Sequence, residues 1–167
     1  MNWNYTADTE NVNKGRSGII KAGEYEALIV NVEQRTAKSG TESINVEFVL
    51  RNDVQQEYQN KHVWMDVWRT QKTIENGQYA RNINTISKVA GIQNGQKFEG
   101  FESWVKAVKN RPCKITVGIE IYNDKEKNTV KWLNDTAFPN VAHKFKDTTT
   151  NTATQQPVEE ETDDLPF

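Results

Sequence analysis

CKITVGIEIY, residues 113–122, carries an apolar side chain at every second position. Side chains two residues apart on an extended chain point to the same face, so this alternation is typical of a β-strand with one buried face. The residues predicted to face the core are Cys113, Ile115, Val117, Ile119 and Ile121. This stretch is the strongest strand pattern in the chain, and the other elements are assigned around it.

The two-residue period recurs in three stretches before this strand and in one after it. Polar or glycine-containing segments separate the stretches, as expected for turns, and residues 123–128 are predicted to form a hairpin loop. The four further predicted strands are residues 24–34, 43–51, 62–68 and 129–136.

The period changes between the third and fourth predicted strands. Apolar residues recur there at three- and four-residue spacing, which predicts amphipathic helices over residues 81–90 and 101–110. Gly91 stands where the glycine that follows a helix belongs, and Pro112 follows the second helix. The polar segment 52–61, between the second and third strands, has no assigned place in the predicted fold.

The predicted order is three strands, a helical segment and two strands. This is the order of an OB-fold, a five-stranded Greek-key barrel with its helix between strands 3 and 4. We therefore predict a mainly β, OB-fold-like barrel over residues 1–146, in which residues 1–20 form an N-terminal arm. Residues 147–167 are predicted to be a disordered acidic tail. Other small β-rich folds with one helical insertion share this order and stay open as alternatives.

The composition restricts the class of protein. The chain has 167 residues and one cysteine, Cys113, so no disulfide can form within it, which suits a reducing cytoplasm. No apolar run approaches the ~18 residues that cross a membrane, and the N-terminus lacks the pattern of a signal peptide. We therefore expect a cytoplasmic protein without membrane contact.

The net charge of −2 averages two unlike segments. All 21 Lys and Arg lie in residues 1–146 together with 17 of the 23 acidic residues, so this body carries a charge of +4. The other six acidic residues give residues 147–167 a charge of −6. A mildly basic body joined to an acidic tail favours a nucleic-acid-binding protein.

The sequence lacks the residue patterns of known catalytic sites. The two histidines, His62 and His143, are far apart and have no Cys or carboxylate at metal-ligand spacing. Neither a phosphate-binding P-loop nor a Gly-x-Ser-x-Gly nucleophile motif occurs. We therefore predict a protein that is not an enzyme and that needs no metal or cofactor.

Cations and aromatic rings occur together where a single-stranded nucleic acid needs them, because phosphates require cations and bases stack on exposed rings. Two tryptophans alternate with apolar residues in the third predicted strand, and an arginine follows it. The loops after strands 1 and 4 of an OB-fold commonly bind the ligand, and both predicted loops are basic. The predicted DNA-binding residues are Arg35, Lys38, Arg51, Trp64, Trp68, Arg69, Tyr122, Lys125, Lys127, Lys131 and Trp132.

The tryptophans also have structural interpretations. One ring of the Trp64 and Trp68 pair is able to plug an end of a small barrel. Trp132 lies two residues after Val130, so a regular strand would place both side chains on the same face. Either a core or a surface position is therefore open for Trp132. Trp68 is the preferred stacking candidate because it lies at a strand end, directly before Arg69.

The C-terminal tip combines acidic and apolar residues. A ring and a free α-carboxylate on its last residue suit a partner with an apolar pocket rimmed by Lys or Arg. The ending resembles the tails of bacterial and phage single-stranded DNA-binding proteins, and this resemblance implies that it recruits replication and recombination proteins. A solubilising tail that ends in Phe by chance is the alternative. The predicted partner-binding residues are Asp163, Asp164, Leu165, Pro166 and Phe167.

The body also resembles a known family. The motifs that carry the resemblance are Gly23-Glu24-Tyr25-x-x-x-Ile29, Lys38-Ser39-Gly40 before Ile44-x-Val46-x-Phe48, and Ile86-x-x-Val89-Ala90-Gly91. With the tail, they resemble a family of phage single-stranded DNA-binding proteins, long described as a domain of unknown function, that have an OB-fold and an acidic tail. The resemblance implies a protein that coats single-stranded DNA in phage DNA replication, recombination and repair, and it leaves open a homo-oligomer such as a dimer.

An interpretation from a different class is a non-enzymatic phage adaptor. Its β-domain would dock on protein, and its tail would mimic the tail of the host single-stranded DNA-binding protein to occupy that protein's partners. The tail fits this interpretation equally well. An adaptor, however, has no need of a basic body.

Overall fold

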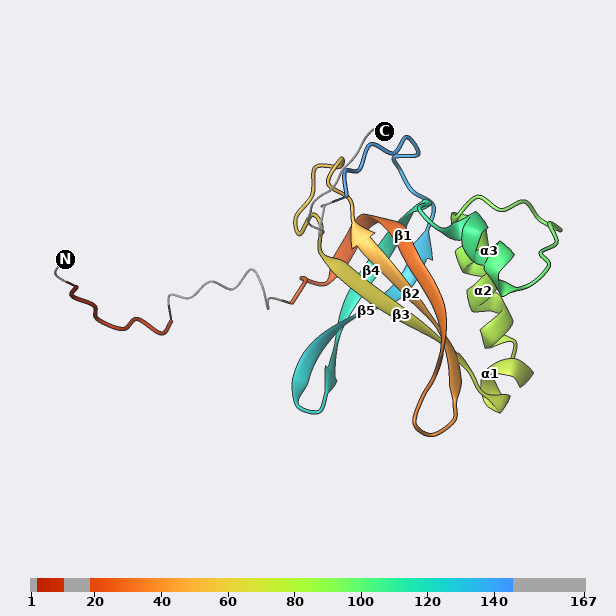
Figure 1. Cartoon of the computed structure of the whole chain (residues 1–167), viewed down its shortest axis with the longest axis horizontal. Helices are drawn as coiled ribbons and strands as arrows, with labels where there is room; N and C mark the ends of the chain where they lie inside the picture. Colours follow the sequence, from red (N-terminus) through yellow and green to blue (C-terminus); the bar gives the residue numbers. More distant parts are fainter. Residues whose placement is uncertain (1–2, 11–18, 146–167) are drawn as a thin grey trace, which may run out of the picture.

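Five antiparallel strands form one sheet in the order β3-β2-β1-β4-β5 (Figure 1). The computed structural model describes residues 3–10 and 19–145, so the predicted tail and its tip at residues 163–167 lie outside the described residues. Along the chain the strands are β1 (Gly23–Thr36), β2 (Glu42–Leu50), β3 (His62–Arg69), β4 (Pro112–Tyr122) and β5 (Lys125–Asn134).

β1 is the central strand of the sheet, since it pairs with both β2 and β4. Its register with β2 shifts between Ile29 and Asn31. Such a bulge resets the alternation of side chains along a strand. Ile29 and Val32, which are three residues apart, therefore both reach the core.

The sheet curls until its two edge strands, β3 and β5, lie beside each other. The described residues of these strands share no backbone ladder, so the barrel stays open along this line. The predicted fold class, a mainly β OB-fold-like arrangement with helices between strands 3 and 4, is confirmed.

The hairpin that joins β4 and β5 is tighter than predicted. Its turn consists of Asn123 and Asp124, whose φ angles are 51° and 63°. Two consecutive residues with positive φ are typical of a two-residue turn between antiparallel strands. β5 therefore begins at Lys125, and the predicted loop over residues 123–128 is wrong.

Three helices lie on one side of the sheet, on the right in Figure 1. α2 and α3 confirm the two predicted helices, and Gly91 follows α2 with a φ of +88°. The sequence analysis did not predict α1, whose five residues are too few to show a helical period. The helices are α1 (Gln71–Glu75), α2 (Gln78–Val89) and α3 (Phe101–Val108).

The core lies between the curled sheet and the buried faces of α2 and α3. Ile20, which was predicted to belong to the arm, is buried in this core, and Asn128 holds its backbone N–H and C=O through two hydrogen bonds of 2.8 Å. Ile119 and Ile121, which were predicted to face the core, are exposed because β4 continues beyond the core into the hairpin. No helix in the described part of the chain is long and apolar enough to cross a membrane.

Candidate nucleic-acid interface

β3 carries two tryptophans on the face of the sheet that points away from the core. Val63 and Val67 are buried, whereas Trp64 and Trp68 are 45% and 43% exposed. Because the side chains of a strand alternate between its faces, the two rings lie on the same outer face. Half-exposed rings on an open strand face suit the stacking of unpaired bases.

Polar side chains of β2 and β3 surround these rings. Pairing with β2 sets Trp64 opposite Glu47 and Trp68 opposite Ser43. The imidazole of His62 lies beside Trp64, with ring centroids 6.1 Å apart, and its Nδ1 is 2.7 Å from a carboxylate oxygen of Glu47. Trp64 therefore has a ring neighbour on its own strand, whereas no ring contact involves Trp68 in the described part of the chain.

The β1–β2 hairpin brings two predicted cations, Arg35 and Lys38, to the end of β3, and β3 itself ends with the third, Arg69. Lys38 is exposed in the turn. A guanidinium nitrogen of Arg35 is 2.6 Å from Glu33, and one of Arg69 is 3.2 Å from Glu42. Ion pairs between exposed side chains contribute about 0–1 kcal/mol, so a phosphate can compete for both arginines.

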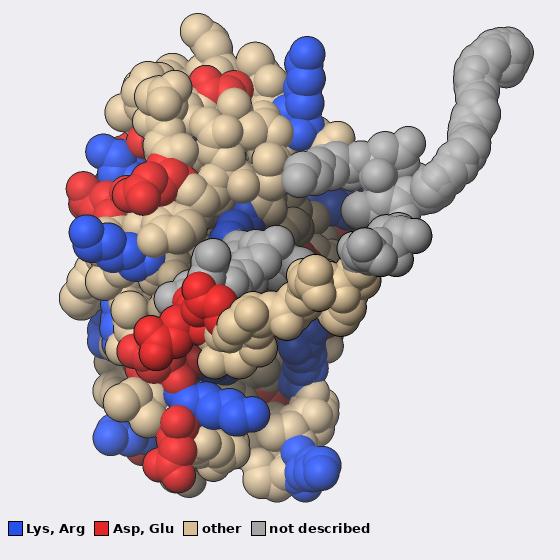
Figure 2. Space-filling view, turned by 90° about the vertical axis from the view of Figure 1, so that its left-hand side faces the viewer, with Lys and Arg blue, Asp and Glu red and all other residues tan. Residues whose placement is uncertain are grey.

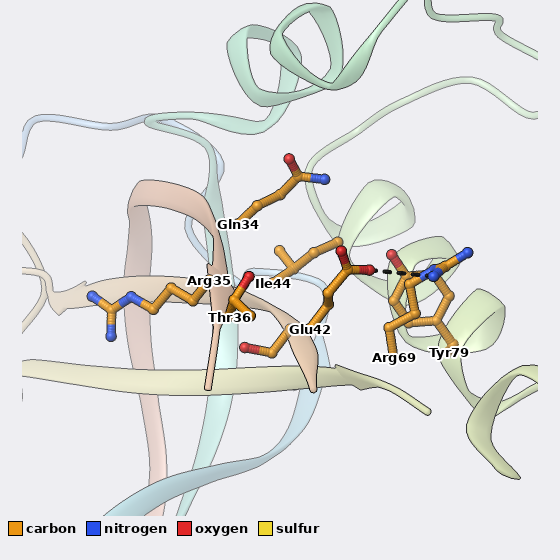
Figure 3. Close-up of a pocket in the computed structure, with 8 residues that line it drawn as sticks. Gln34, Arg35, Thr36, Glu42, Ile44, Arg69 and Tyr79 are labelled. Carbon is orange, nitrogen blue, oxygen red and sulfur yellow. Dashed lines mark hydrogen bonds and ion pairs between the residues drawn. The ribbon is translucent and has the colours of Figure 1, made fainter. Parts of the chain in front are cut away.

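A small cavity of about 150 Å³ is lined by residues that include both arginines, and the Arg35 side chain points away from Arg69 and Tyr79 (Figure 3). Tyr79 of α2 closes one side of it, with the Arg69 guanidinium carbon 6.0 Å from the centroid of the Tyr79 ring. The sequence analysis did not single out Tyr79, which lies just before the predicted helix. The remaining lining residues come from β1, β2 and β3, namely Gln34, Arg35, Thr36, Glu42, Ser43, Ile44 and Arg69.

The β4–β5 hairpin carries the second group of predicted residues. Tyr122 is 68% exposed, and Lys125 and Lys127 are exposed on β5. The ammonium group of Lys131 is 3.0 Å from Glu120. This hairpin therefore presents one ring and three cations, and one of the cations has a carboxylate partner among the described residues.

Trp132 is exposed because β5 contains an irregularity. The register with β4 shifts so that Val130 pairs with Val117 and Trp132 pairs with Thr116. Lys131 is the extra residue of this bulge, and Val130 and Trp132 consequently point to opposite faces. Val130 is buried and Trp132 is 70% exposed. Of the core and surface positions that the sequence allowed for Trp132, the structure therefore shows the surface position.

Arg81 is a cation near Trp132 that the sequence analysis did not select. Both residues line a cavity of about 360 Å³ between α2 and the open side of the barrel, together with Lys131. The Arg81 guanidinium donates to the Asn76 carbonyl at 3.0 Å, and no carboxylate partner of Arg81 occurs among the described residues. Its position on the polar side of an amphipathic helix gave no signal that would separate it from an ordinary surface arginine.

The two hairpins project from the same end of the sheet, at the bottom of Figure 1. Since β3 lies between β2 and β5 around the barrel, the tryptophans of β3 have one hairpin on each side. Figure 2 shows Lys and Arg interspersed with Asp and Glu over the side that it presents, so no continuous positive surface covers that side. The two half-exposed rings of β3 distinguish this region as a candidate interface.

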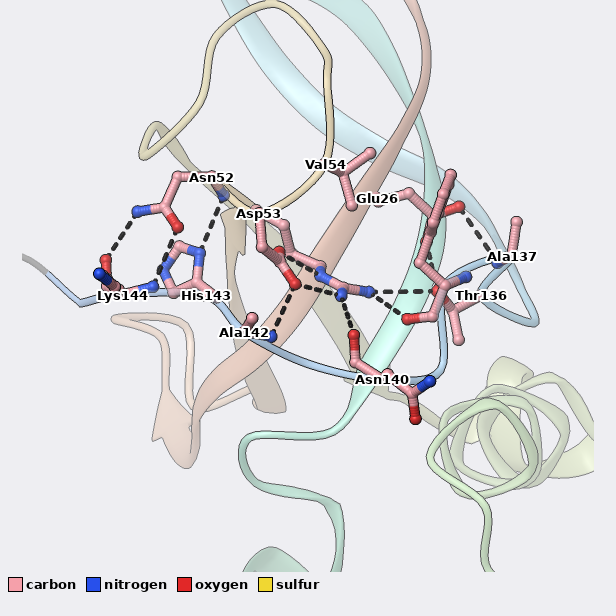
Figure 4. Close-up of polar contacts among 12 residues, drawn as sticks. Glu26, Asn52, Asp53, Val54, Thr136, Ala137, Asn140, Ala142, His143 and Lys144 are labelled. Carbon is pink, nitrogen blue, oxygen red and sulfur yellow. Dashed lines mark hydrogen bonds and ion pairs between the residues drawn. The ribbon is translucent and has the colours of Figure 1, made fainter.

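Arg51 is a correction to the predicted interface. It is 0% exposed, and all five of its guanidinium N–H groups have acceptors within the protein (Figure 4). Nε and Nη2 donate to the Asp53 carboxylate at 2.8 and 2.6 Å, and Nη2 also donates to the Asn140 carbonyl at 3.1 Å. Nη1 donates to the Phe138 carbonyl at 2.6 Å and to the Thr136 hydroxyl at 3.4 Å. The prediction that Arg51 contacts DNA is therefore wrong.

The same network gives the polar segment 52–61 its place in the fold. Asp53 also accepts a hydrogen bond of 2.8 Å from the Ala142 N–H, and Asn52 binds the backbone of Lys144 in both directions. These contacts hold the chain segment 136–144 against the segment 52–61 (Figure 4), and we call the whole arrangement the Arg51 clasp. The Arg51 hydrogen bonds lower the pKa of Asp53 to about 2.

His143 completes the clasp as a neutral acceptor. Its Nδ1 accepts a hydrogen bond of 3.0 Å from the Asn52 N–H. Burial lowers the pKa of His143, which agrees with an unprotonated Nδ1. The histidine thus has a structural role, and the segment 136–144 that carries it lies at the end of the molecule opposite to the two hairpins (Figure 1).

The described residues offer little for other chemistry. Burial raises the pKa of the Cys113 thiol to about 12, so this cysteine is not a reactive thiolate. Residues 3–10 and 19–145 contain no group of three or more His, Cys, Asp or Glu that could hold a metal ion.

The chain thus combines an OB-fold-like β-barrel with exposed tryptophans on one outer face and cations in two neighbouring hairpins. Residues 5–157 match the model of a family described as "Protein of unknown function (DUF669)", and the chain belongs to that family. No curated protein matches the chain. Among solved structures it is similar to a chain of "Yeast RPA bound to ssDNA", with 12% identity, a TM-score of 0.34, and coverage of 76% of this chain and 84% of that chain.

Proposed function

We propose that this protein binds single-stranded DNA without requiring a particular sequence. The observation that carries the proposal is the pair of half-exposed rings, Trp64 and Trp68, on one outer face of β3. Bases of any kind stack on such rings, because every base has a π-face. A duplex keeps its bases stacked inside, so these rings favour single strands.

The phosphates are assigned to cations on both sides of the rings. Arg35, Lys38 and Arg69 belong to one side, and Lys131 to the other, with Lys125 and Lys127 further along the same hairpin. Three of the nearest four cations have an exposed carboxylate partner, so DNA exchanges weak ion pairs for phosphate contacts. We therefore expect moderate affinity per site and strong dependence on salt.

The test is a titration of intrinsic tryptophan fluorescence with oligo(dT), and with duplex of equal length, at several salt concentrations. We expect quenching by the single strand and little response to the duplex. If about four phosphates are neutralised, the logarithm of affinity should fall against the logarithm of salt concentration with a slope near −3.

Two outcomes would contradict the proposal. Equal quenching by duplex would indicate a general polyanion-binding surface. No response to any strand, in protein whose circular dichroism shows a folded β-domain, would favour the adaptor interpretation, in which the β-domain docks on protein.

We also propose the wider role that the sequence resemblance implies. The protein would coat exposed strands in phage DNA replication, recombination and repair in the cytoplasm of a bacterial host, as a monomer or a homo-oligomer. The tip at residues 163–167 would recruit the replication and recombination enzymes that act next on the strand. The two half-exposed rings on the outer face of β3 support strand binding, whereas the tip lies outside the described residues.

A chain that ends at Glu161 tests the role of the tip. We expect it to bind oligo(dT) at least as tightly as the full chain, because six residues with two negative charges are removed. We expect it to lose the capture of host replication proteins that the immobilised full chain retains. Equal capture by both chains would assign partner binding to residues 1–161 instead.

A further inference from the structure

The carboxylate of Asp66 lies between the two candidate stacking rings. A surface that bound only the phosphates of a strand would carry a cation at this position. Asp66 follows Trp64 by two residues and precedes Trp68 by two, so all three side chains share the outer face of β3. Asp66 is exposed. Its Oδ1 accepts a hydrogen bond of 2.8 Å from the buried amide of Asn45, the residue opposite on β2.

The Asn45 amide leaves one carboxylate oxygen for a ligand. Among the hydrogen bonds of the described residues, none involves Oδ2 of Asp66. An ionised carboxylate accepts hydrogen bonds and donates none. Asp66 therefore presents an oriented hydrogen-bond acceptor to a ligand group that lies between Trp64 and Trp68.

The spacing of the rings leaves room for a base at this acceptor. Residues four apart on a strand are about 13 Å apart, at roughly 3.3 Å per residue. Neighbouring bases stacked on each other advance by only about 3.4 Å. Bases on Trp64 and Trp68 are therefore not stacked on each other, and at least one nucleotide spans the surface of Asp66.

We propose that Asp66 reads the base between the two rings and prefers one that carries an amino group. This inference rests on the proposed binding of single-stranded DNA. Cytosine and adenine each present an exocyclic amino donor, and guanine does so on its Watson–Crick edge, so all three can donate to Oδ2. Thymine and uracil have no exocyclic amino group, and their single N3–H donor lies between two carbonyl oxygens, which the carboxylate repels. The interface accepts every sequence, with a bias against thymine and uracil at one position.

The experiment compares oligo(dC) with oligo(dU) of equal length, since these strands differ in the base edge and lack the thymine methyl group. Binding is measured by the anisotropy of labelled strands. We expect the natural chain to bind oligo(dC) about five- to tenfold more tightly, the range of a single base contact. In Asp66→Asn the ratio should fall to near one, because an amide offers both a donor and an acceptor.

The matched control is Glu99→Gln, which removes the same charge from an exposed residue between α2 and α3. It should leave the ratio as it is in the natural chain. If Asp66→Asn binds both strands more tightly by the same factor, the ratio of the two affinities is unchanged. Asp66 then only repels phosphates, and the inference is wrong. A ratio near one in the natural chain also overturns it. Failure to bind either strand would overturn the proposed function itself, which is a distinguishable result.

Discussion

Replacing Arg51 with methionine lowers the free energy of unfolding by about 3–5 kcal/mol, the usual effect of removing one partner of a buried ion pair. The Asp53 side chain is only 9% exposed, so its carboxylate stays buried without a counter-ion. The carbonyl groups of Phe138 and Asn140 lose their donor as well. Urea unfolding followed by circular dichroism measures the effect.

Arg35→Met is the matched control, because Arg35 also has a carboxylate 2.6 Å away but is 55% exposed. An exposed pair contributes about 0–1 kcal/mol, so this variant should unfold close to the natural chain. Equal unfolding midpoints for the two variants would mean that the Arg51 clasp does not stabilise the fold.

The clasp also has a pH signature. Asp53 has a folded-state pKa of about 2 against an ordinary value of 3.8, so its stabilising effect is complete above about pH 4. As the pH falls from 4 towards 2 and the carboxylate becomes protonated, about 2 kcal/mol of stability should be lost. Asp53→Asn should lack this part of the pH dependence in the same urea measurement.

Replacing Trp68 with alanine weakens the binding of oligo(dT) by about 1–3 kcal/mol, the range found for rings that stack on bases. Trp64→Ala should have a similar effect, and the double variant should bind most weakly of all. Both rings are about half exposed, so their removal leaves no large internal cavity. The measurement uses the anisotropy of a labelled strand, since these variants change the protein fluorescence.

Phe138→Ala controls for the loss of any exposed ring. Phe138 is 49% exposed and lies in the C-terminal segment of the clasp, away from the hairpins. It should leave the affinity unchanged. Trp68→Phe should restore most of the binding, because it keeps a stacking surface. If a folded Trp64→Ala, Trp68→Ala double variant binds with unchanged affinity, the outer face of β3 is not the binding surface.

Some of the candidate site was predictable from local pattern. In β3, the alternation of valines with tryptophans predicts that the valines face the core and leaves the rings outside, and the observed exposures agree. The basic residues of the two hairpins were also predicted from the sequence, since they lie in or beside the segments that join clear strand patterns. In the structure Lys38 lies in a turn, whereas Arg35 lies on β1 and Lys125, Lys127 and Lys131 lie on β5. Tyr79 and Arg81 were missed because they become part of the site only through the packing of α2 against the barrel.

Trp132 and Arg51 show where local pattern reaches its limit. The parity of Trp132 with Val130 allowed a core position, and only the bulge at Lys131 moves the ring to the surface. Arg51 ends a strand with its side chain pointing outward, which indicated a surface cation. The segments 52–61 and 136–144 close over it, and the second of these is about 90 residues away in the chain.

The sequence by itself determined the order of the elements, the core faces of β2 and β3, and the charge difference between body and tail. These properties follow from the hydrophobic period and the composition of single segments. Both can be read from residues that are close together in the chain. The tertiary structure alone decided which outward-facing side chains stay exposed. That outcome depends on segments distant in the chain closing over some of them, and on bulges that change the parity of a strand, and neither is written in a local pattern.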